Sequence, residues 1–213
     1  MTPERYHKVY RALRQRQHDL TVLYENLEKV HNLAAIARTG ETVGVERVHA
    51  IAPEPVKLRG LAGRGAHRWV TVETHSTTAQ ACASLKKEGF TIVATHLGED
   101  AIDFRDYDFT QPTAIMMGNE GEGLSEEAVQ LADVNVIIPM MGVVGALNVS
   151  VAAAVLLFEA QRQRLAAGFY QRVMEDEARL RTRVFEECYP RISRHYREKG
   201  LPYPELDEDG QVV

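Results

Sequence analysis

The stretch TAIMMGNEGEGLSEEAVQL, residues 113–131, holds the pattern that decides the fold. Its first five residues, Thr113–Met117, carry no charge, and a turn with three glycines follows them. A short apolar run bounded by a turn is typical of a buried strand, and Ser125 followed by two glutamates is typical of the start of a helix. The stretch therefore predicts one strand, a glycine-rich turn and a helix over residues 125–131.

The same alternation of strand and helix continues on both sides of this stretch. The predicted strands are residues 20–24, 47–51, 69–72, 90–95, 113–117 and 134–138, and the predicted helices are residues 33–42, 76–88, 125–131 and 148–167. Between residues 52 and 66 we predict a surface loop long enough to suggest a functional role. Such alternation predicts an α/β fold in which a parallel sheet is flanked by helices on both faces.

Both ends of the chain differ from this pattern. Over residues 3–17 apolar residues recur at helical spacing and basic residues occupy the remaining face, which predicts an amphipathic basic helix. We expect two further helices near residues 173–187 and 191–199, followed by an acidic end. The excess of positive charge at the front favours contact with phosphate over a purely solvated helix. The residues expected to make such contacts are Arg5, Lys8 and Arg11.

Composition and residue spacing argue against a membrane protein, a secreted protein and a metalloprotein. The longest apolar stretch, residues 149–158, is far shorter than the roughly 20 residues that span a bilayer. The charged first residues lack the apolar centre of a secretory signal. We therefore expect a cytoplasmic protein without a membrane segment. Two distant cysteines and eight histidines show no spacing typical of a metal site, so we also expect no metal.

Three loops follow predicted strands and define a candidate pocket. Ligands in open parallel sheets bind at the carboxyl ends of the strands, here after Thr95, Met117 and residue 138. The turn at 118–123 offers backbone amides and two acids, although a tight strand-to-helix connection explains it equally well. The loop PMMGVVGAL, residues 139–147, is apolar and suits an adenine ring.

A fourth segment, HNLAAIART at residues 31–39, places Asn32 at the start of a helix and Arg38 nearly two turns along it. Taken alone, Asn32 is more often a helix cap, and Arg38 is more often a surface charge. Neither residue identifies a site without the other segments.

Segment 31–39, the glycine-rich turn and the apolar loop together resemble the three sequence motifs of the SpoU group of SPOUT methyltransferases, in the same order and at similar separations. The resemblance covers residues 20–165 approximately. It extends to flanks that are similar to the TrmH branch, and GLPYP at residues 200–204 resembles the C-terminal extension of enterobacterial members. The flanks are DLTV at 19–22, DFR at 103–105 and FEAQRQR at 158–164.

The resemblance implies both a fold and a cofactor. It implies a deep trefoil knot in the part of the chain from about residue 90 onward, and a homodimer in which motif residues of one subunit lie beside the cofactor of the other. It implies an N-terminal extension at 1–18, a SpoU methyltransferase domain at 19–167 and a C-terminal extension at 168–213. The cofactor implied is S-adenosyl-L-methionine, held by Thr95, Gly118, Ile138, Met140 and Leu147.

The resemblance also implies an activity, which is methylation of the 2′-hydroxyl of guanosine 18 in the tRNA D-loop. Arg38 is then the key catalytic residue, Asn32 supports it, Glu120 orders the dimer-facing pocket and Asn148 organises the knot loop. Since a guanidinium stays protonated, Arg38 is better suited to holding phosphate and stabilising a developing oxyanion than to acting as a base. His31 is a chemically more ordinary base, and the identity of the base stays open. With tRNA as partner, the phosphate contacts extend to Arg162 and Arg164.

Two other functions stay open from the sequence. The first is 2′-O-methylation of ribosomal RNA or of another tRNA position. The second is a non-catalytic, knotted RNA-binding dimer that has lost turnover, because Ala146 stands where relatives usually carry a serine. The presence of Arg38 and Asn148 counts against the second function.

Overall fold

A computed structural model of the chain describes all residues except 27–29, 59–67 and 99. Most of the predicted loop at 52–66 therefore lies outside the described residues. The chain forms two compact units, one of residues 17–167 and one that combines residues 1–16 with 168–213. Among the described residues, no helix is both long and apolar enough to span a bilayer.

The larger unit is built on a seven-stranded sheet in the order β3-β2-β1-β6-β4-β7-β5, and every pair of neighbouring strands is parallel. The central strands β1 and β6 pair along their whole length, from Leu20 opposite Thr113 to Tyr24 opposite Met117. Both strands are completely buried, as their uncharged sequences predict. The strands are β1 (Leu20–Tyr24), β2 (Arg47–Ile51), β3 (Thr71–His75), β4 (Thr91–Thr95), β5 (Ile102–Asp103), β6 (Thr113–Met117) and β7 (Val134–Ile137).

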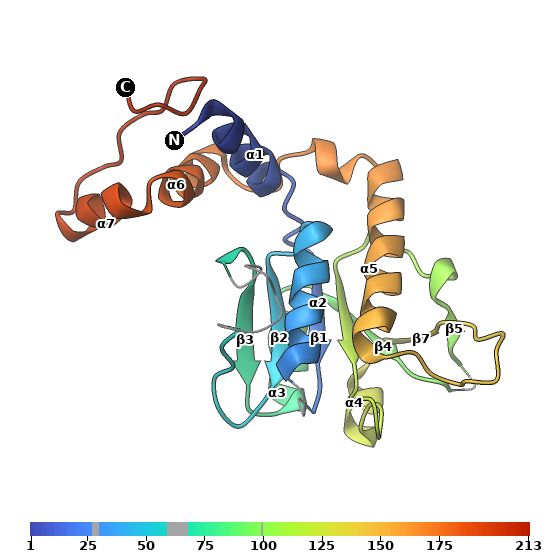
Figure 1. Cartoon of the computed structure of the whole chain (residues 1–213). Coiled ribbons are helices and arrows are strands. Elements are labelled where there is room, and N and C mark those ends of the chain that lie inside the picture. The colour runs from blue at the N-terminus through green and yellow to red at the C-terminus, as the bar shows by residue number, and fades with distance from the viewer. Residues whose placement is uncertain (27–29, 59–67, 99) are drawn as a thin grey trace. The chain divides into compact units, whose positions relative to one another are not determined.

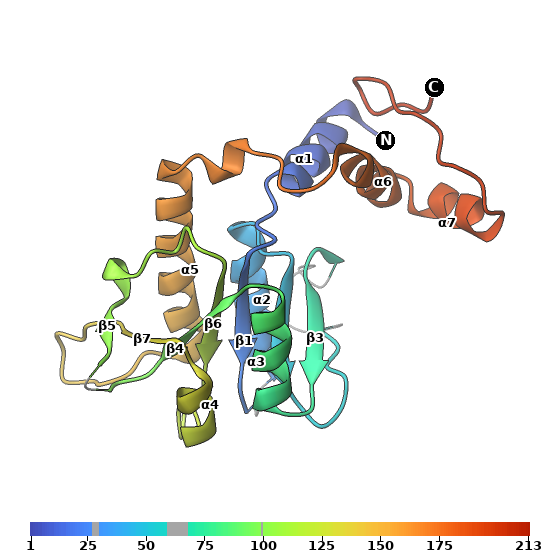
Figure 2. The same ribbon diagram turned by 180° about the vertical axis from the view of Figure 1, so that it is seen from behind.

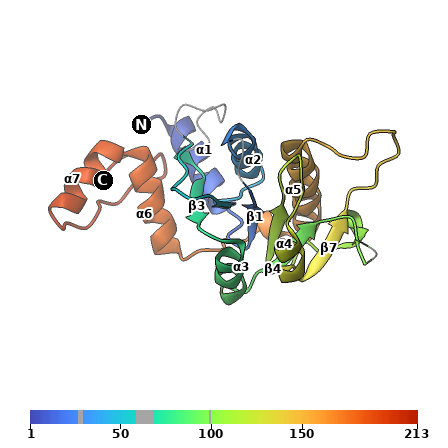
Figure 3. The ribbon, with the colours of Figure 1, turned by 90° about the horizontal axis from the view of Figure 1, so that it is seen from below.

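Helices cover both faces of this sheet, which confirms the predicted layers. Helices α2 (Val30–Thr42) and α5 (Val149–Ala166) pack together on one face, where the larger apolar core lies (Figure 1). Helices α3 (Thr78–Lys87) and α4 (Glu126–Leu131) cover the opposite face over a second core, as the view from behind and the view from below show (Figures 2 and 3). The fold is therefore a three-layer α/β arrangement.

Helix starts follow the expected caps at two positions and differ at two others. The Ser125 side chain accepts a hydrogen bond from the Ala128 amide, and Asn148 accepts one from the Ser150 amide. Helix α3 is capped by Thr77, one residue later than the predicted Ser76. The predicted cap Asn32 is wrong, because α2 begins at Val30 and Asn32 lies inside its first turn, buried.

The smaller unit joins the two ends of the chain. Helix α1 (Pro3–Arg14) packs against α6 (Glu177–Cys188), and α7 (Pro190–Glu198) follows α6. The last residues fold back onto these helices, since the Tyr189 hydroxyl donates to the Gly210 carbonyl at 2.7 Å. A Cβ atom at Gly210, which has a φ of 74°, would lie 2.2 Å from Cγ of Tyr6, so only glycine fits this contact.

Candidate active site at the carboxyl edge of the sheet

The three candidate loops leave the sheet side by side. Strand β4 lies between β6 and β7, and all three run in the same direction. The residues that follow them therefore meet at one edge, as expected for a ligand site in a parallel sheet. The Thr95 hydroxyl donates to the Met116 carbonyl at 3.2 Å and ties the ends of β4 and β6 together.

The glycine-rich turn is closed by its own hydrogen bonds. The Oδ1 atom of Asn119 accepts from the amides of Gly121, at 2.9 Å, and Glu122, at 2.7 Å. The backbones of Asn119 and Gly123 also exchange two hydrogen bonds of 3.2 Å. A Cβ atom at Gly118 would lie 2.0 Å from the carbonyl carbon of Gly123, so the turn closes this tightly only with glycine at 118.

The first prediction concerns this turn. Gly118→Ala is expected to weaken binding of the cofactor that the sequence resemblance implies by at least about 10-fold, because the turn must open to make room for the alanine side chain. Isothermal titration with S-adenosylmethionine measures the change. Gly121→Ala is the matched control, since its Cβ atom would lie an ordinary 3.6 Å from its nearest neighbour, Oδ1 of Asn119. Equal affinities for the two variants would contradict the prediction.

Two of the predicted site residues come together directly. The Nδ2 atom of Asn148 donates to Oε1 of Glu120 and so connects the glycine-rich turn to the start of α5. The Oδ1 atom of Asn148 accepts from the amide of Ser150, at 2.9 Å, and from its hydroxyl, at 2.6 Å. Asn148 therefore fixes the end of the apolar loop and the side chain of Glu120 at once.

Sequence reasoning missed Glu25, which follows β1 and is only 2% exposed. Its carboxylate accepts from the hydroxyl of Thr78 at 2.6 Å, and from the hydroxyl and amide of Ser125 at 2.7 and 2.8 Å. Glu25 thereby holds the starts of α3 and α4 against β1, and α4 directly follows the glycine-rich turn. An acid placed directly after an uncharged strand was the available signal.

The second prediction tests this anchor. Glu25→Ala is expected to lower the free energy of unfolding by about 2–4 kcal/mol, because it leaves buried donors of Thr78 and Ser125 without their acceptor. Urea unfolding followed by circular dichroism measures the loss. Glu127→Ala, an exposed residue in the first turn of α4, is the control and should unfold like the wild type. A Glu25→Ala variant as stable as this control would exclude the anchoring role.

Asn32 and Arg38 both lie on α2, but they differ in exposure. Asn32 is buried, and its Nδ2 atom has no hydrogen-bond partner within the described part of the chain. Arg38 is exposed, and among the described residues no hydrogen bond or ion pair joins its side chain to the three loops. Because α2 follows β1 and α5 follows β7, both helices begin at the carboxyl edge.

The apolar loop at 139–147 lies open. Met140 and Leu147 are 37% and 38% exposed, Ile138 is half-buried, and Val143 is fully exposed. Such exposure of large apolar side chains marks a surface that binds a ligand or another protein.

The DFR flank at 103–105 covers the last residue of β5 and the start of a 3-10 turn at Phe104–Asp106. Arg105 donates to the Asp103 carboxylate through its amide, at 3.0 Å, and through Nε, at 2.8 Å. These hydrogen bonds lower the pKa of Asp103 to about 2, so its negative charge persists at any physiological pH.

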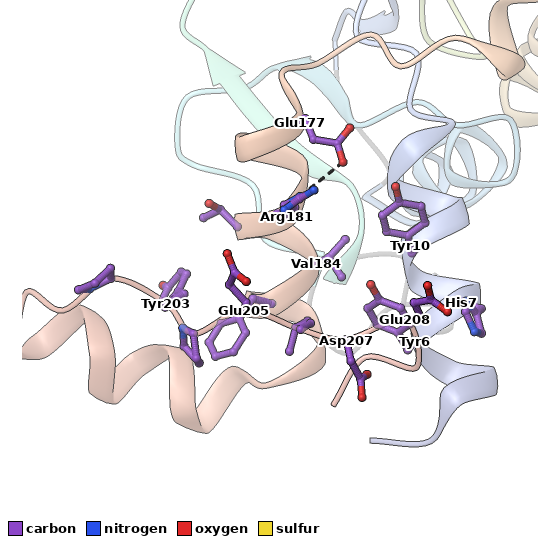
Figure 4. Close-up of a pocket in the computed structure, with 15 residues that line it drawn as sticks. Tyr6, His7, Tyr10, Glu177, Arg181, Val184, Tyr203, Glu205, Asp207 and Glu208 are labelled. Atoms are coloured by element: carbon purple, nitrogen blue, oxygen red, sulfur yellow. Dashed lines mark hydrogen bonds and ion pairs between the residues drawn. The ribbon is translucent and has the colours of Figure 1, made fainter. Parts of the chain in front are cut away.

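Helix α1 presents different chemistry on its two sides. Arg5, Lys8 and Arg11 are exposed, and the last two line a shallow hollow of about 500 Å³. On another side, α1, α6 and the C-terminal segment enclose a groove of about 720 Å³ with aromatic walls and four acids (Figure 4). The acids are Glu177, Glu205, Asp207 and Glu208. The hollow has two cations against one acid, Glu4, and the groove has four acids against one cation, Arg181, so a phosphate group is favoured at the hollow over the groove.

The predicted phosphate contact at Arg164 is wrong, whereas Arg162 is exposed. The Arg164 side chain is 0% exposed and forms an ion pair with Asp19. It also donates to the carbonyls of Phe109, at 2.9 Å, and Gln111, at 3.1 Å. A guanidinium enclosed in this way is a structural element of the larger unit. Arg162 is paired with Glu159 at the surface and stays a candidate contact.

Comparisons with protein families and with single relatives all indicate an RNA methylase of the SpoU type. The sequence profile of the SpoU rRNA Methylase family matches residues 19–158, and that of the SpoU rRNA methylase C-terminal region matches residues 162–213. The tRNA (guanosine(18)-2′-O)-methyltransferase of Escherichia coli K12 is 46% identical over 215 aligned positions, which cover 100% of this chain and 94% of the relative.

Solved structures agree with the sequence comparison. The A. aeolicus TrmH/SpoU tRNA modifying enzyme superimposes with a TM-score of 0.78 at 36% identity, over 89% of this chain and 97% of the other. The SpoU methyltransferase AviRb from Streptomyces viridochromogenes, in complex with AdoMet, gives a TM-score of 0.64 at 27% identity, over 70% and 62% of the two chains. The fold, the paired motif residues and these matches together show that the chain belongs to the SpoU rRNA methylase family.

Proposed function

We propose that this chain transfers the methyl group of S-adenosyl-L-methionine to the 2′-hydroxyl of guanosine 18 in tRNA. The observation that carries the proposal is the 46% identity to the E. coli enzyme across the full chain, both terminal extensions included. The edge of the sheet supports it, since Asn148 and Glu120 join the second and third motif segments. A tRNA substrate also agrees with a cytoplasmic location.

The loops at the carboxyl edge fit the proposed cofactor. Gly118 leaves no side chain at the bend, and the exposed Met140 and Leu147 offer apolar contacts to an adenine ring. Thr95 and Ile138 stand at the ends of the two neighbouring strands. S-adenosylmethionine supplies a methyl group that is already activated by its positive sulfur. The residues of the chain therefore act mainly by aligning the 2′-oxygen with that methyl group and by excluding water.

Arg38 is proposed as the catalytic residue. It is exposed on α2, and its permanent positive charge suits it to hold an RNA phosphate and to stabilise the developing 2′-oxyanion. Asn32, buried nearly two turns before it, supports this part of the helix. His31 is exposed beside Asn32 and is a candidate base.

A homodimer completes the proposed site. Besides the open loop at 139–147, α5 exposes Val151, Phe158 and Leu165, each about half exposed and spaced by two helical turns. A second copy of the chain would cover this apolar stripe. We further propose that the part of the chain from about residue 90 forms the trefoil knot of the family, within a methyltransferase domain of residues 19–167 flanked by extensions at 1–18 and 168–213.

The third prediction concerns the RNA contacts of the N-terminal extension. The double variant Lys8→Ala with Arg11→Ala is expected to weaken tRNA binding and to reduce the slope of log affinity against log salt by roughly 1–2, because each lost phosphate contact removes about 0.7–0.9 from the slope. Filter binding at several salt concentrations measures both. Lys86→Ala with Lys87→Ala is the charge-matched control on α3. An unchanged slope in the first variant would remove these residues from the interface.

Transfer of labelled methyl from S-adenosylmethionine to unmodified tRNA tests the function directly. Methyl on the ribose of guanosine 18, absent from a transcript with adenosine at that position, is the expected result. Methylation of ribosomal RNA or of another tRNA ribose would support an enzyme with a different target. Binding of cofactor and tRNA without transfer would support the non-catalytic dimer and direct attention to Ala146.

A further inference from the structure

Strand pairing brings together two histidines and a glutamate away from the loops described above. In the β2–β3 pair, His49 lies opposite Glu73, and His75 follows Glu73 by two residues. Residues two apart on a strand point to the same face, so Glu73 and His75 lie on one side of β3 beside His49. The Nδ1 atom of His49 is 2.9 Å from Nε2 of His75 and 3.5 Å from Oε2 of Glu73.

We propose that His49, Glu73 and His75 bind one divalent transition-metal ion of the zinc type. One donor atom from each of the three side chains lies within 4.8 Å of the other two. In a tetrahedral zinc site, with bonds of about 2.0–2.1 Å, neighbouring ligand atoms are about 3.4 Å apart. The separation of Nδ1 and Oε2 already meets this spacing. The two imidazole nitrogens share a hydrogen bond of 2.9 Å, so the ion would have to replace the proton between them and move them apart by about 0.5 Å.

The burial of His49 and the exposure of Glu73 suit a metal site with three protein ligands and one coordination position open to water. His49 is 1% exposed and is fixed by its surroundings, whereas the Glu73 side chain is 43% exposed. An ion can therefore reach the cluster from the Glu73 side, with two nitrogens and one oxygen from the protein and water in the fourth position. Two imidazoles and a carboxylate suit zinc and neighbouring transition metals better than Mg²⁺ or Ca²⁺, which prefer oxygen ligands.

The neighbouring charges act in both directions. Oε2 of Glu73 faces His49 and attracts a cation, whereas the Arg47 guanidinium, which interacts with Oε1 of Glu73 at 3.3 Å and pairs with Glu88, disfavours positive charge at His49. Binding also carries a cost. Binding through Nδ1 places the ring proton of His49 on Nε2, which is buried and has no hydrogen-bond partner within the described residues.

That cost predicts a site of moderate affinity rather than one on which folding depends. The ion would tie edge strand β3 to β2, and β1 and β6 separate this cluster from the loops after β4 and β7. The site is thus independent of the proposed methyl transfer, and the metal-free chain should fold and act.

Titration of the metal-free, full-length protein with Zn²⁺, followed by calorimetry, tests the proposal. The expected result is one Zn²⁺ per chain and a melting temperature about 5 °C higher at saturation. His75→Ala and Glu73→Gln should each weaken binding at least about 10-fold while keeping the metal-free melting temperature near that of the wild type. His195→Ala, an exposed histidine on α7, should bind Zn²⁺ like the wild type.

X-ray absorption of the zinc complex gives a second readout, which should show two imidazole ligands that fall to one in His75→Ala. Absence of saturable binding to the wild type would overturn the proposal. Binding that survives both His75→Ala and Glu73→Gln, or that is lost in His195→Ala, would place the ion elsewhere and would also overturn it.

Discussion

Replacing Arg38 with alanine is expected to lower the methylation rate by about 100- to 1000-fold while the affinity for S-adenosylmethionine stays nearly unchanged. The side chain is exposed, and among the described residues it has no hydrogen-bond or ion-pair partner, so its loss should not disturb the fold. In the proposed mechanism it removes the positive charge that stabilises the developing oxyanion, and loss of one such group typically costs this much.

Single-turnover transfer of labelled methyl to tRNA measures the rate, and calorimetry measures cofactor affinity. Arg38→Lys keeps the charge but not the planar fork of donors, so partial activity is expected from it. Lys87→Ala, exposed at the end of α3 on the opposite face of the sheet, serves as the control. Wild-type turnover in Arg38→Ala would refute the catalytic assignment.

Arg164→Ala is expected to lower the free energy of unfolding by about 3–5 kcal/mol, whereas Arg162→Ala should change it by less than about 1 kcal/mol. The two arginines are two residues apart on α5. Arg164 is fully buried and holds Asp19 and two backbone carbonyls, so its removal leaves the half-buried carboxylate of Asp19 and these carbonyls without their donor. Arg162 is 67% exposed, and its ion pair with Glu159 is screened by water.

Urea unfolding of the two variants measures the difference, and tRNA binding adds a second comparison. Arg162→Ala should reduce tRNA affinity if it contacts phosphate. Arg164→Ala, once folded, should bind tRNA like the wild type, because its guanidinium does not reach the surface. Similar stability of the two variants would show that the buried network around Asp19 contributes little.

The central strands could be predicted because their sequences leave little choice. The bounds of β1, β2 and β6 match the predicted ranges, since each strand is a short stretch of mostly apolar residues whose flanking sequences are typical of turns or helices. Strand β3 begins two residues later than predicted and extends through Glu73 and His75. These polar residues gave no sign of a strand in the sequence, because a strand at the edge of a sheet need not be apolar. Strand β5 has two residues, too few for any periodic pattern.

The site could be predicted in part because loops at the ends of parallel strands must meet. The partners of individual side chains could not be predicted, because they depend on contacts between segments that are distant in the sequence. Glu25 and Ser125 are 100 residues apart, and Arg164 and Asp19 are 145 residues apart. Helical spacing places Arg162 and Arg164 on the same helix, but only the packed structure separates the buried one from the exposed one.

The contact between the two ends of the chain sets an order for folding during synthesis. Helix α1 is synthesised before the larger unit, whereas its partner α6 and Gly210, which lies against Tyr6, are synthesised after it. The larger unit, residues 17–167, is complete before them and can fold as a unit while translation continues. The apolar side of α1 therefore stays exposed until α6 has been made, and a chain that lacks α6 would expose this apolar surface and be prone to aggregate.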